Sequence, residues 1–245
     1  TLNIASGVTN VYSGYLGGIG GMFVYPDDPA TANNLNLTKT GSGTLVLQAP
    51  SNTYTGITTV QGGTLVVNAD QRNSGLITVQ NGAVLGGTGR VGAVTVWSGG
   101  YLSPGASPGV LTAHGDVTLQ GGSVFQVELN GTTAGSEYDQ LSIVAGSLKL
   151  QQDLGVRPDL VVTLGFTPSP GNSFDIVTGL SGFDWSFDGY FQDKPDGTEF
   201  AVGSTALRID YLSDTIRLTV VPEPATGFLL LLAGAGIYLR RRLLR

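Results

Sequence analysis

The chain has 245 residues, of which 38 are Gly, 12% are charged and none is Cys. This composition is typical of turn-rich β structure, and the lack of cysteine excludes disulfides, thiolate metal ligands and a cysteine nucleophile. Residues 225–245 hold four of the 12 basic residues and no acid, which leaves 8 bases against 18 acids, a formal charge of −10, in the rest of the chain. Such an acidic body disfavours nucleic acid as a partner.

Residues 1–34 predict short strands and loops, with a protruding Pro-Asp-Asp-Pro turn at 26–29. Two carboxylates in a proline turn are typical of a solvated loop, so we expect no metal site there. The chain starts in the middle of its repeating pattern, and an unpaired first coil would expose strand edges that can pair with another chain. We therefore expect further coils to precede Thr1.

A short motif, Thr-Val-x-x-Gly-Gly-x-Leu, recurs about every 20 residues along the first half of the chain. Its apolar alternation predicts a short strand with one buried face, and its glycines permit a sharp turn at positive φ. We predict coils of about three short strands, stacked as a parallel β-solenoid over residues 1–132. The alternative is a β-sandwich with glycine-rich hairpins, but the even spacing favours the solenoid. The second glycine of successive copies is Gly43, Gly63, Gly82, Gly100 and Gly122.

The most complete copy reads LTKTGSGTLVL at 37–47, NTYTG at 52–56 and TTVQGGTL at 58–65. It resembles the autotransporter-associated β-strand repeat, from which Ala-Pro-Ser at 49–51 and Ile57 depart at a corner. The resemblance implies a right-handed parallel β-helix displayed on a bacterial surface. In that family the helix is a passenger with no chemistry of its own.

The stack continues with GGTGRV at 86–91 and LSPGASPG at 102–109, which resemble segments found late in the same passengers. Pro104 and Pro108 cannot donate to a strand ladder, so we expect both on an outward corner. His114 is the only histidine. With no second histidine and no Ser-Asp arrangement to pair it, we expect a surface or hydrogen-bonded histidine rather than a catalytic one.

Near residue 133 the glycine pairs end, aromatic and acidic residues become more frequent, and the predicted strands lengthen. We predict an antiparallel β domain over 133–220 that caps the C-terminal end of the solenoid. In its last two strands apolar residues alternate toward the core, which should place Asp210 opposite Arg217 as an exposed ion pair worth at most about 1 kcal/mol. The expected strands are 140–144, 147–150, 160–166, 173–177, 199–202, 207–211 and 216–220.

Five aromatic residues gather in one stretch beside two aspartates. The stretch suits a sugar-stacking platform, because aromatic faces and carboxylates both favour carbohydrate. It also suits a loop whose rings complete the core of the cap, and this second interpretation is favoured. The residues are Phe183, Trp185, Phe187, Tyr190 and Phe191, with Asp184 and Asp188.

The chain ends in a Val-Pro-Glu-Pro motif, an apolar run and a cluster of arginines. The run of about 15 residues is short for a membrane span of about 20, but the arginines can snorkel to the headgroups and should stay cytoplasmic. We predict a short transmembrane helix in the tail, residues 221–245. The motif is Val221, Pro222, Glu223 and Pro224, and the basic cluster is Arg240, Arg241 and Arg242.

Together the three parts of the tail resemble a PEP-CTERM sorting signal. The resemblance implies export across the inner membrane of a Gram-negative bacterium, recognition of residues 221–224 by an exosortase, and removal of the tail. A permanent small anchor is the alternative. A true autotransporter ends in a membrane β-barrel, and no such run of alternating strands is seen, so we expect the passenger fold without self-transport.

These features predict an exported structural or adhesin-like protein of the cell surface, outer membrane or medium, held in the inner membrane only in transit. Exopolysaccharide, biofilm matrix or cell-surface glycans are the expected partners, besides the exosortase. The alternatives are a carbohydrate-binding module on the aromatic loop and, less favoured, a β-helix polysaccharide-degrading enzyme. An enzyme of that kind needs acidic residues on successive coils, yet Asp70 is the only acidic residue among residues 35–115. We expect no catalytic residue, cofactor or metal ligand.

Overall fold

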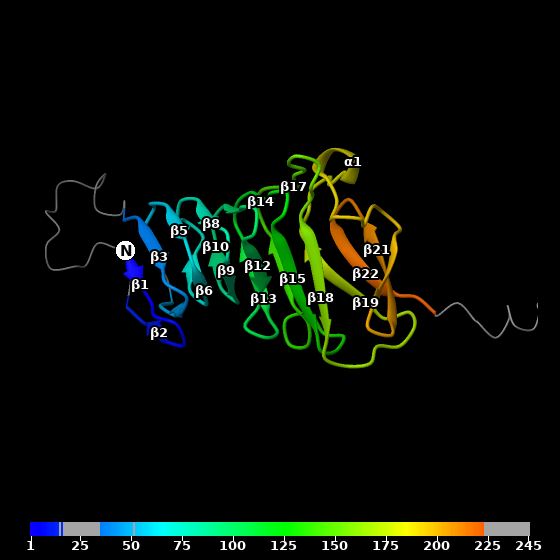
Figure 1. Ribbon diagram of the computed structural model, residues 1–245, viewed down its shortest axis with the longest axis horizontal. Helices are drawn as coiled ribbons and strands as arrows, with labels where there is room; N and C mark the ends of the chain where they lie inside the picture. Colours follow the sequence, from blue (N-terminus) through cyan, green and yellow to red (C-terminus); the bar gives the residue numbers. More distant parts are fainter. Residues whose placement is uncertain (15, 17–34, 51, 223–245) are drawn as a thin grey trace, which may run out of the picture.

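The computed structural model describes residues 1–14, 16, 35–50 and 52–222. Within them the chain forms an elongated stack of parallel strands that ends in an antiparallel hairpin (Figure 1). The predicted turn at 26–29, the motif residues Glu223 and Pro224, and the apolar run with its arginines lie outside the described residues.

Three sheets run along the stack. Sheet A contains β1 (Leu2–Asn3), β3 (Leu37–Thr40), β5 (Thr58–Val60), β8 (Ile77–Val79), β11 (Val94–Val96), β14 (Val117–Leu119) and β17 (Leu148–Leu150). Sheet B contains β2 (Thr9–Tyr12), β4 (Thr44–Leu47), β6 (Gly63–Val67), β9 (Ala83–Gly87), β12 (Tyr101–Pro104), β15 (Val124–Leu129) and β18 (Asp159–Leu164). Sheet C contains β7 (Asp70–Gln71), β10 (Arg90–Val91), β13 (Val110–Ala113), β16 (Gln140–Ile143), β19 (Ser173–Thr178), β22 (Thr215–Val220), β21 (Thr205–Tyr211) and β20 (Glu199–Val202).

From β5 to β19 the chain visits the sheets in the order A, B, C and then repeats the circuit, so each coil contributes one strand to each sheet. Every coil pairs in parallel with the coil before it, as in the register Thr58 with Ile77 and Leu65 with Leu85. Because all named strands before residue 130 pair in parallel, the prediction of an all-β, solenoid-like stack is confirmed. The hairpins of the alternative β-sandwich do not occur among those strands.

Glycine is required where the chain turns between sheets A and B. Gly63 has φ 63°, and a Cβ on it would strike the carbonyl oxygen of Gly43, which lies at the same turn of the previous coil. Only glycine combines this left-handed conformation with so close an approach of two backbones. A Cβ on Gly43 or Gly100 would likewise approach a backbone carbonyl oxygen, whereas one on Gly82 would meet nothing within 4 Å, so only some of the recurring glycines mark close contacts between backbones.

The core is a set of columns in which one inward residue stacks on its counterpart in the next coil. One column on sheet A contains a buried lysine, which lies between Leu2 of β1 and a run of five apolar residues. Lys39 has 0% of its surface exposed, and its Nζ donates to the carbonyl oxygens of Thr40 (3.0 Å), Gly41 (2.8 Å) and Gly62 (2.9 Å). Burial lowers the pKa of Lys39, while the three carbonyls satisfy its three donors. After Leu2 the column continues with Lys39, Val60, Val79, Val96, Leu119 and Leu150.

The same early coils bury a second polar group. The hydroxyl of Tyr54 lies 2.7 Å from Thr58 Oγ1 and donates to Gln71 Oε1 at 3.1 Å, and all three side chains are buried. Their hydrogen bonds join the corner before β5 to β7 across the interior. Later coils fill the same interior with apolar residues, among them Phe125 and Leu148.

The solenoid is longer than the sequence predicts. Parallel pairing continues past residue 133 through β16, β17 and β18, and it ends where β16 pairs with β19. Antiparallel pairing begins only between β19 and β22. The predicted boundary is wrong because the change in pattern marks coils that become wider, with six-residue strands in β15 and β18, rather than the end of the stack.

The last two strands form the predicted hairpin. Asp210 pairs with Arg217 in register, and the apolar residues of both strands are buried, so the predicted facing is confirmed. The ion pairs differ from the prediction. Arg217 Nε donates to Asp175 Oδ1 at 2.6 Å, and Asp210 accepts from Arg208 instead. Because β22 lies between β19 and β21, Arg217 has an aspartate on each side and takes the one on β19.

Pro104 does not lie on an outward corner. It is buried as the last residue of β12, and the N–H of Gly105 makes the next bond, to the carbonyl oxygen of Gly87 at 2.9 Å. A proline fits at this strand end because the ladder resumes one residue later. Pro108 is half-buried in the loop that follows.

Replacing Lys39 with methionine keeps the length of the side chain but leaves buried carbonyl oxygens without their donor. We expect Lys39→Met to lower the free energy of unfolding by about 1–3 kcal/mol. The matched control is Lys194→Met, in the loop between α1 and β20, whose Nζ makes one hydrogen bond of 3.3 Å and lies over the ring of Phe200. Urea unfolding followed by circular dichroism measures both variants. Equal stability of Lys39→Met and the native chain would contradict a stabilising role for the buried amine.

Candidate functional site

The aromatic stretch folds against the last coil as the short helix α1 (Trp185–Asp188) and the loop around it. Asp184 caps the helix by accepting from Ser186 N at 2.9 Å, and Asp188 Oδ2 accepts from Asp184 N at 3.0 Å. Two bonds tie the following loop to the segment between β17 and β18: Arg157 N donates to Gln192 Oε1 (2.8 Å), and Gln192 N donates to Pro158 O (2.7 Å). These two hydrogen bonds fix the loop to the solenoid.

The five aromatic side chains divide between core and surface. Phe191 stacks on Phe125 with ring centroids 5.8 Å apart, and Phe183 stacks on Tyr211 at 6.1 Å, so these rings complete the core as predicted. Trp185 is 37% exposed and Phe187 is 88% exposed. The interpretation as a core loop holds for Phe183 and Phe191, while Trp185 and Phe187 leave an aromatic surface.

Tyr190 links the two groups. Its ring meets Trp185 edge-to-face at 5.9 Å, and the Arg157 guanidinium lies 3.7 Å above the ring centroid. A cation over an aromatic face is attracted by the ring quadrupole. Arg157 thus holds Tyr190 in place while its charge stays at the surface.

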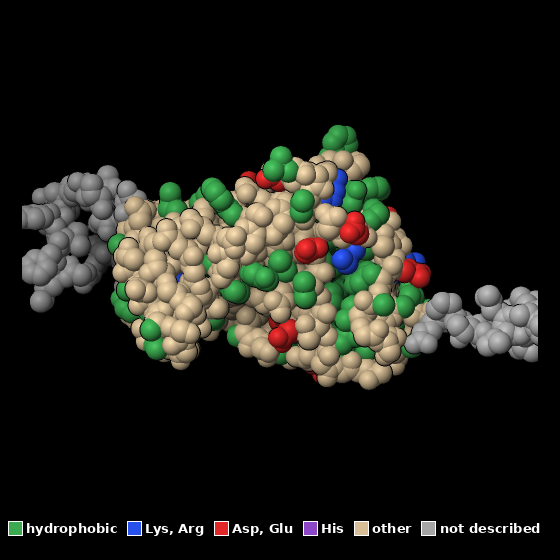
Figure 2. Space-filling view, in the orientation of Figure 1, with side chains coloured by type: hydrophobic (Ala, Val, Ile, Leu, Met, Phe, Trp, Pro, Cys, Tyr) green, Lys and Arg blue, Asp and Glu red, His purple; other side chains and the backbone are tan. Residues whose placement is uncertain are grey.

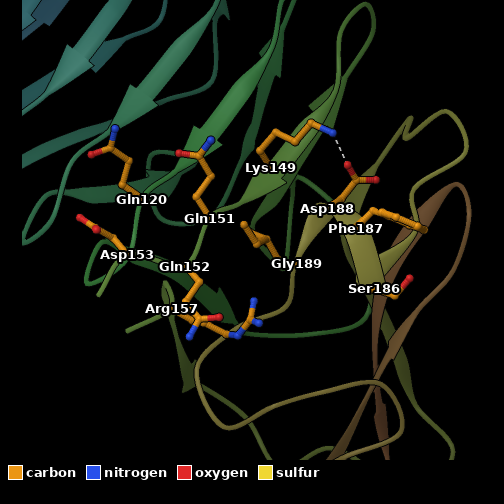
Figure 3. Close-up of a pocket in the computed structure, with 11 residues that line it drawn as sticks. Gln120, Lys149, Gln151, Gln152, Asp153, Arg157, Ser186, Phe187, Asp188 and Gly189 are labelled. Atoms are coloured by element: carbon orange, nitrogen blue, oxygen red, sulfur yellow. Dashed lines mark hydrogen bonds and ion pairs between the residues drawn. The ribbon is translucent and has the colours of Figure 1, made fainter. Parts of the chain in front are cut away.

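A pocket of about 710 Å³ opens between α1 and the corner that follows sheet A (Figure 3). We call it the corner pocket. Lys149 forms an ion pair with Asp188 on α1, and Gln120 and Gln151 lie on the side of the pocket away from α1 (Figure 3). The pocket is lined by Gln120, Lys149, Leu150, Gln151, Gln152, Asp153, Arg157, Ser186, Phe187, Asp188 and Gly189.

The corner pocket is polar but electrically balanced. Two basic residues, Lys149 and Arg157, face two acidic residues, Asp153 and Asp188. Three carboxamides add both donors and acceptors without charge. Such a lining suits a neutral, hydroxyl-rich ligand better than an anion or a cation. Of its residues, only Phe187 and Asp188 were singled out from the sequence, because nothing in the sequence shows that a loop near residue 187 faces the turn after β17.

Asp139 lies away from this pocket, under the loop between β12 and β13. It is buried, and its two carboxylate oxygens accept from Gly109 N and Glu128 N, each at 2.9 Å. Burial raises the pKa of Asp139 to about 6, and the nearby charge of Glu128 adds to the rise. The carboxylate fixes the loop of residues 102–109, which sequence reasoning did not assign to any partner.

His114 is half-buried beside a small charged group on sheet C. Asp70 forms ion pairs with Arg72 and with Arg90, the latter at 3.6 Å. Burial, followed by the charges of Arg72 and Arg90, lowers the pKa of His114. Its Nε2 is buried and has no hydrogen-bond partner among the described residues, so the expectation of a satisfied or surface histidine is met only in part.

The start of the sorting motif follows the hairpin directly. Val221 N donates to Ala206 O at 3.0 Å, and Pro222 is exposed. The other motif residues and the arginine cluster lie outside the described part of the chain. Within the described residues, no helix has the length and apolar character needed to cross a membrane, and no three His, Asp or Glu side chains gather as a metal site.

Comparison with known proteins finds two family models. The passenger-associated transport repeat matches residues 37–67, and the PEP-CTERM protein-sorting motif matches residues 220–242. The chain carries an autotransporter-type repeat and a PEP-CTERM sorting motif. Both resemblances seen in the sequence are therefore confirmed.

Two curated proteins share part of the chain. The adhesin BmaC autotransporter of Brucella suis biovar 1 (strain 1330) is 40% identical over 89 residues, which cover 33% of this chain and 2% of that protein. An extracellular serine protease of Serratia marcescens is 37% identical over 93 residues, 38% of this chain and 9% of that protein. The chain spans less than a tenth of the length of either relative.

The raised pKa of Asp139 predicts a pH effect on stability. Because the folded state binds this proton more tightly than the unfolded state, the stability it contributes is complete below the ordinary pKa near 3.8 and is lost as pH rises through about 6. We expect the native chain to lose up to about 3 kcal/mol of unfolding free energy from this group as pH rises to 7.5.

Chemical denaturation at pH 4.5, 6 and 7.5 measures this, with Asp139→Asn as the comparison. The asparagine variant keeps His114, whose lowered pKa acts in the opposite direction, so the difference between the two proteins isolates Asp139. A difference that does not change with pH would show that Asp139 titrates as an ordinary carboxyl.

Proposed function

We propose that this chain is an exported structural, adhesin-like protein of the cell surface or extracellular matrix, delivered through its PEP-CTERM tail. The repeat and the similarity to an adhesin support a structural rather than an enzymatic role. In this proposal the coils wind right-handed, as the passenger repeat implies. The apolar tail spans the inner membrane briefly, with Arg240, Arg241 and Arg242 on the cytoplasmic side.

One observation carries the proposal: the sorting motif follows directly on the last strand of the hairpin, β22. The last backbone bond of the hairpin is made by Val221, and Pro222 already lies at the surface. In this proposal a processing enzyme binds the motif without unfolding the hairpin. An exosortase is the partner that the motif implies, and exopolysaccharide is the proposed matrix component around the released body.

The character of the body supports a scaffold. On the face shown in Figure 2, charged side chains gather toward the C-terminal end of the body, while the earlier coils show mostly uncharged surface. A stack in which every coil pairs with the next is stiff along its axis and presents the same surface repeatedly. Such a spacer can project from a cell or bridge polymers of a matrix without any catalytic residue.

Processing is tested by mass spectrometry of the C-terminal peptide of protein recovered from cells and from medium. We expect loss of the residues after the Val-Pro-Glu-Pro motif in the surface and medium fractions. Ala replacement of Pro222 and Pro224 should keep the tail attached and the protein in the inner membrane. The matched control is Pro170→Ala, in an exposed turn of the solenoid. An intact Arg245 on native protein in the inner membrane would replace this proposal with the permanent anchor.

A further inference from the structure

Sheet A presents two parallel rows of side chains on its outer face. The first row is a threonine from each of five successive coils, followed by Lys149 in the sixth. Register pairs place these residues directly over one another. The row is Thr38, Thr59, Thr78, Thr95, Thr118 and Lys149.

The second row lies two residues further along each strand and consists of glutamines with one tryptophan. Each N–H bonds to a carbonyl of the previous coil, as Trp97 N does to Val79 O (2.9 Å) and Gln120 N to Val96 O (3.0 Å). Trp97 is 51% exposed. The row is Gln61, Gln80, Trp97, Gln120 and Gln151. Four strand spacings of about 4.8 Å make it roughly 19 Å long.

The two rows lead into the corner pocket. Lys149 ends the threonine row, and Gln120 and Gln151 end the glutamine row, and all three line the pocket. The exposed ring of Phe187 stands at the far rim on α1. Rows and pocket therefore form one continuous surface, which we call the sheet A track.

The chemistry of the track selects its ligand. Hydroxyls and carboxamides both donate and accept hydrogen bonds, as sugar hydroxyls do, and Trp97 and Phe187 offer apolar faces. The rows carry no charge before Lys149, which is paired with Asp188, and the pocket has as many acids as bases. A charged polymer would find no complementary field here. The strands under the track from β3 to β14 pair on both sides and offer no free backbone to a partner strand, and only β17, at the end of the sheet beside α1, is an edge strand.

We infer that the sheet A track binds a neutral, linear polysaccharide laid along the solenoid axis, with its end or a bend in the corner pocket. The inference rests on the proposed association with exopolysaccharide and names the surface and the class of glycan. Repetition of the same side chains from coil to coil fits a polymer whose own units repeat.

The chain itself supplies a reporter for the test. Its two tryptophans are Trp97, on the track, and Trp185, beside the pocket. In a Trp185→Phe variant the fluorescence arises from Trp97 alone. Soluble neutral glucan, galactan and galactomannan are titrated into the full chain, with alginate and chitosan as the anionic and cationic comparators. We expect a neutral polysaccharide to change Trp97 emission and protect it from quenching, while both charged polymers do not.

Affinity electrophoresis then compares variants with that polysaccharide. Trp97→Ala should weaken binding about tenfold or more, and Phe187→Ala severalfold, because both remove exposed rings near the centre and end of the track. The matched control is Tyr101→Ala, an aromatic on the outer face of sheet B, which should bind as the native chain does. Circular dichroism melting checks that all three fold.

The inference is overturned if none of the neutral polysaccharides binds, if charged polymers bind better, or if Trp97→Ala and Phe187→Ala both bind normally. The assay uses the full chain from whichever fraction holds it, in mild detergent where the tail is retained. Binding by an unprocessed, anchored protein would keep the track and reject the proposed sorting. Matrix association without binding to any neutral polysaccharide would do the reverse.

Discussion

Each coil of this protein must lie directly over the previous one, because the neighbouring coils hold the partners for most of its backbone N–H and C=O groups. That requirement fixes the register of all three sheets and stacks like positions into columns. It requires glycine where two backbones are in contact, as at Gly43 and Gly63, and apolar side chains at most of the inward positions. The same register also stacks the outward side chains into rows, so it determines the pattern of the surface as well as that of the core.

The interior changes character along the axis. Early coils bury Lys39 and the Tyr54–Gln71 pair, each held by several hydrogen bonds. Later coils widen and fill with aromatic and aliphatic side chains such as Phe125 and Phe191. Buried polar groups cost free energy when a partner is lost, so the early coils depend on accurate alignment of a few atoms. The stability of the later coils depends more on how fully aromatic and aliphatic side chains fill the interior, with Asp139 as a buried polar exception.

Sequence reasoning succeeded where a local period decides the structure. Regular glycine spacing predicts the stack, and two-residue alternation predicts the facing of residues 207–220. It failed where the answer depends on a distant segment. The partner of Arg217 is Asp175, on a strand that no local pattern joins to β22. Similarly, the division of the aromatic rings depends on which of them reaches Phe125 or Tyr211, and a loop has no period from which to read this. The glutamine row was visible as Thr-Val-Gln at residues 59–61 and 78–80, but its meaning requires knowing that these coils are neighbours.

Stacking by whole coils also bears on how such a protein can change its length. A one-residue insertion inside a strand would turn every following side chain to the wrong face of its sheet. Duplication of an entire coil would leave each column and row intact and would add one strand spacing of about 4.8 Å. The reach of the molecule can therefore grow or shrink in equal steps while its hairpin end is unaltered. Variation of that kind would adjust how far a surface stands from the cell without altering what the surface is.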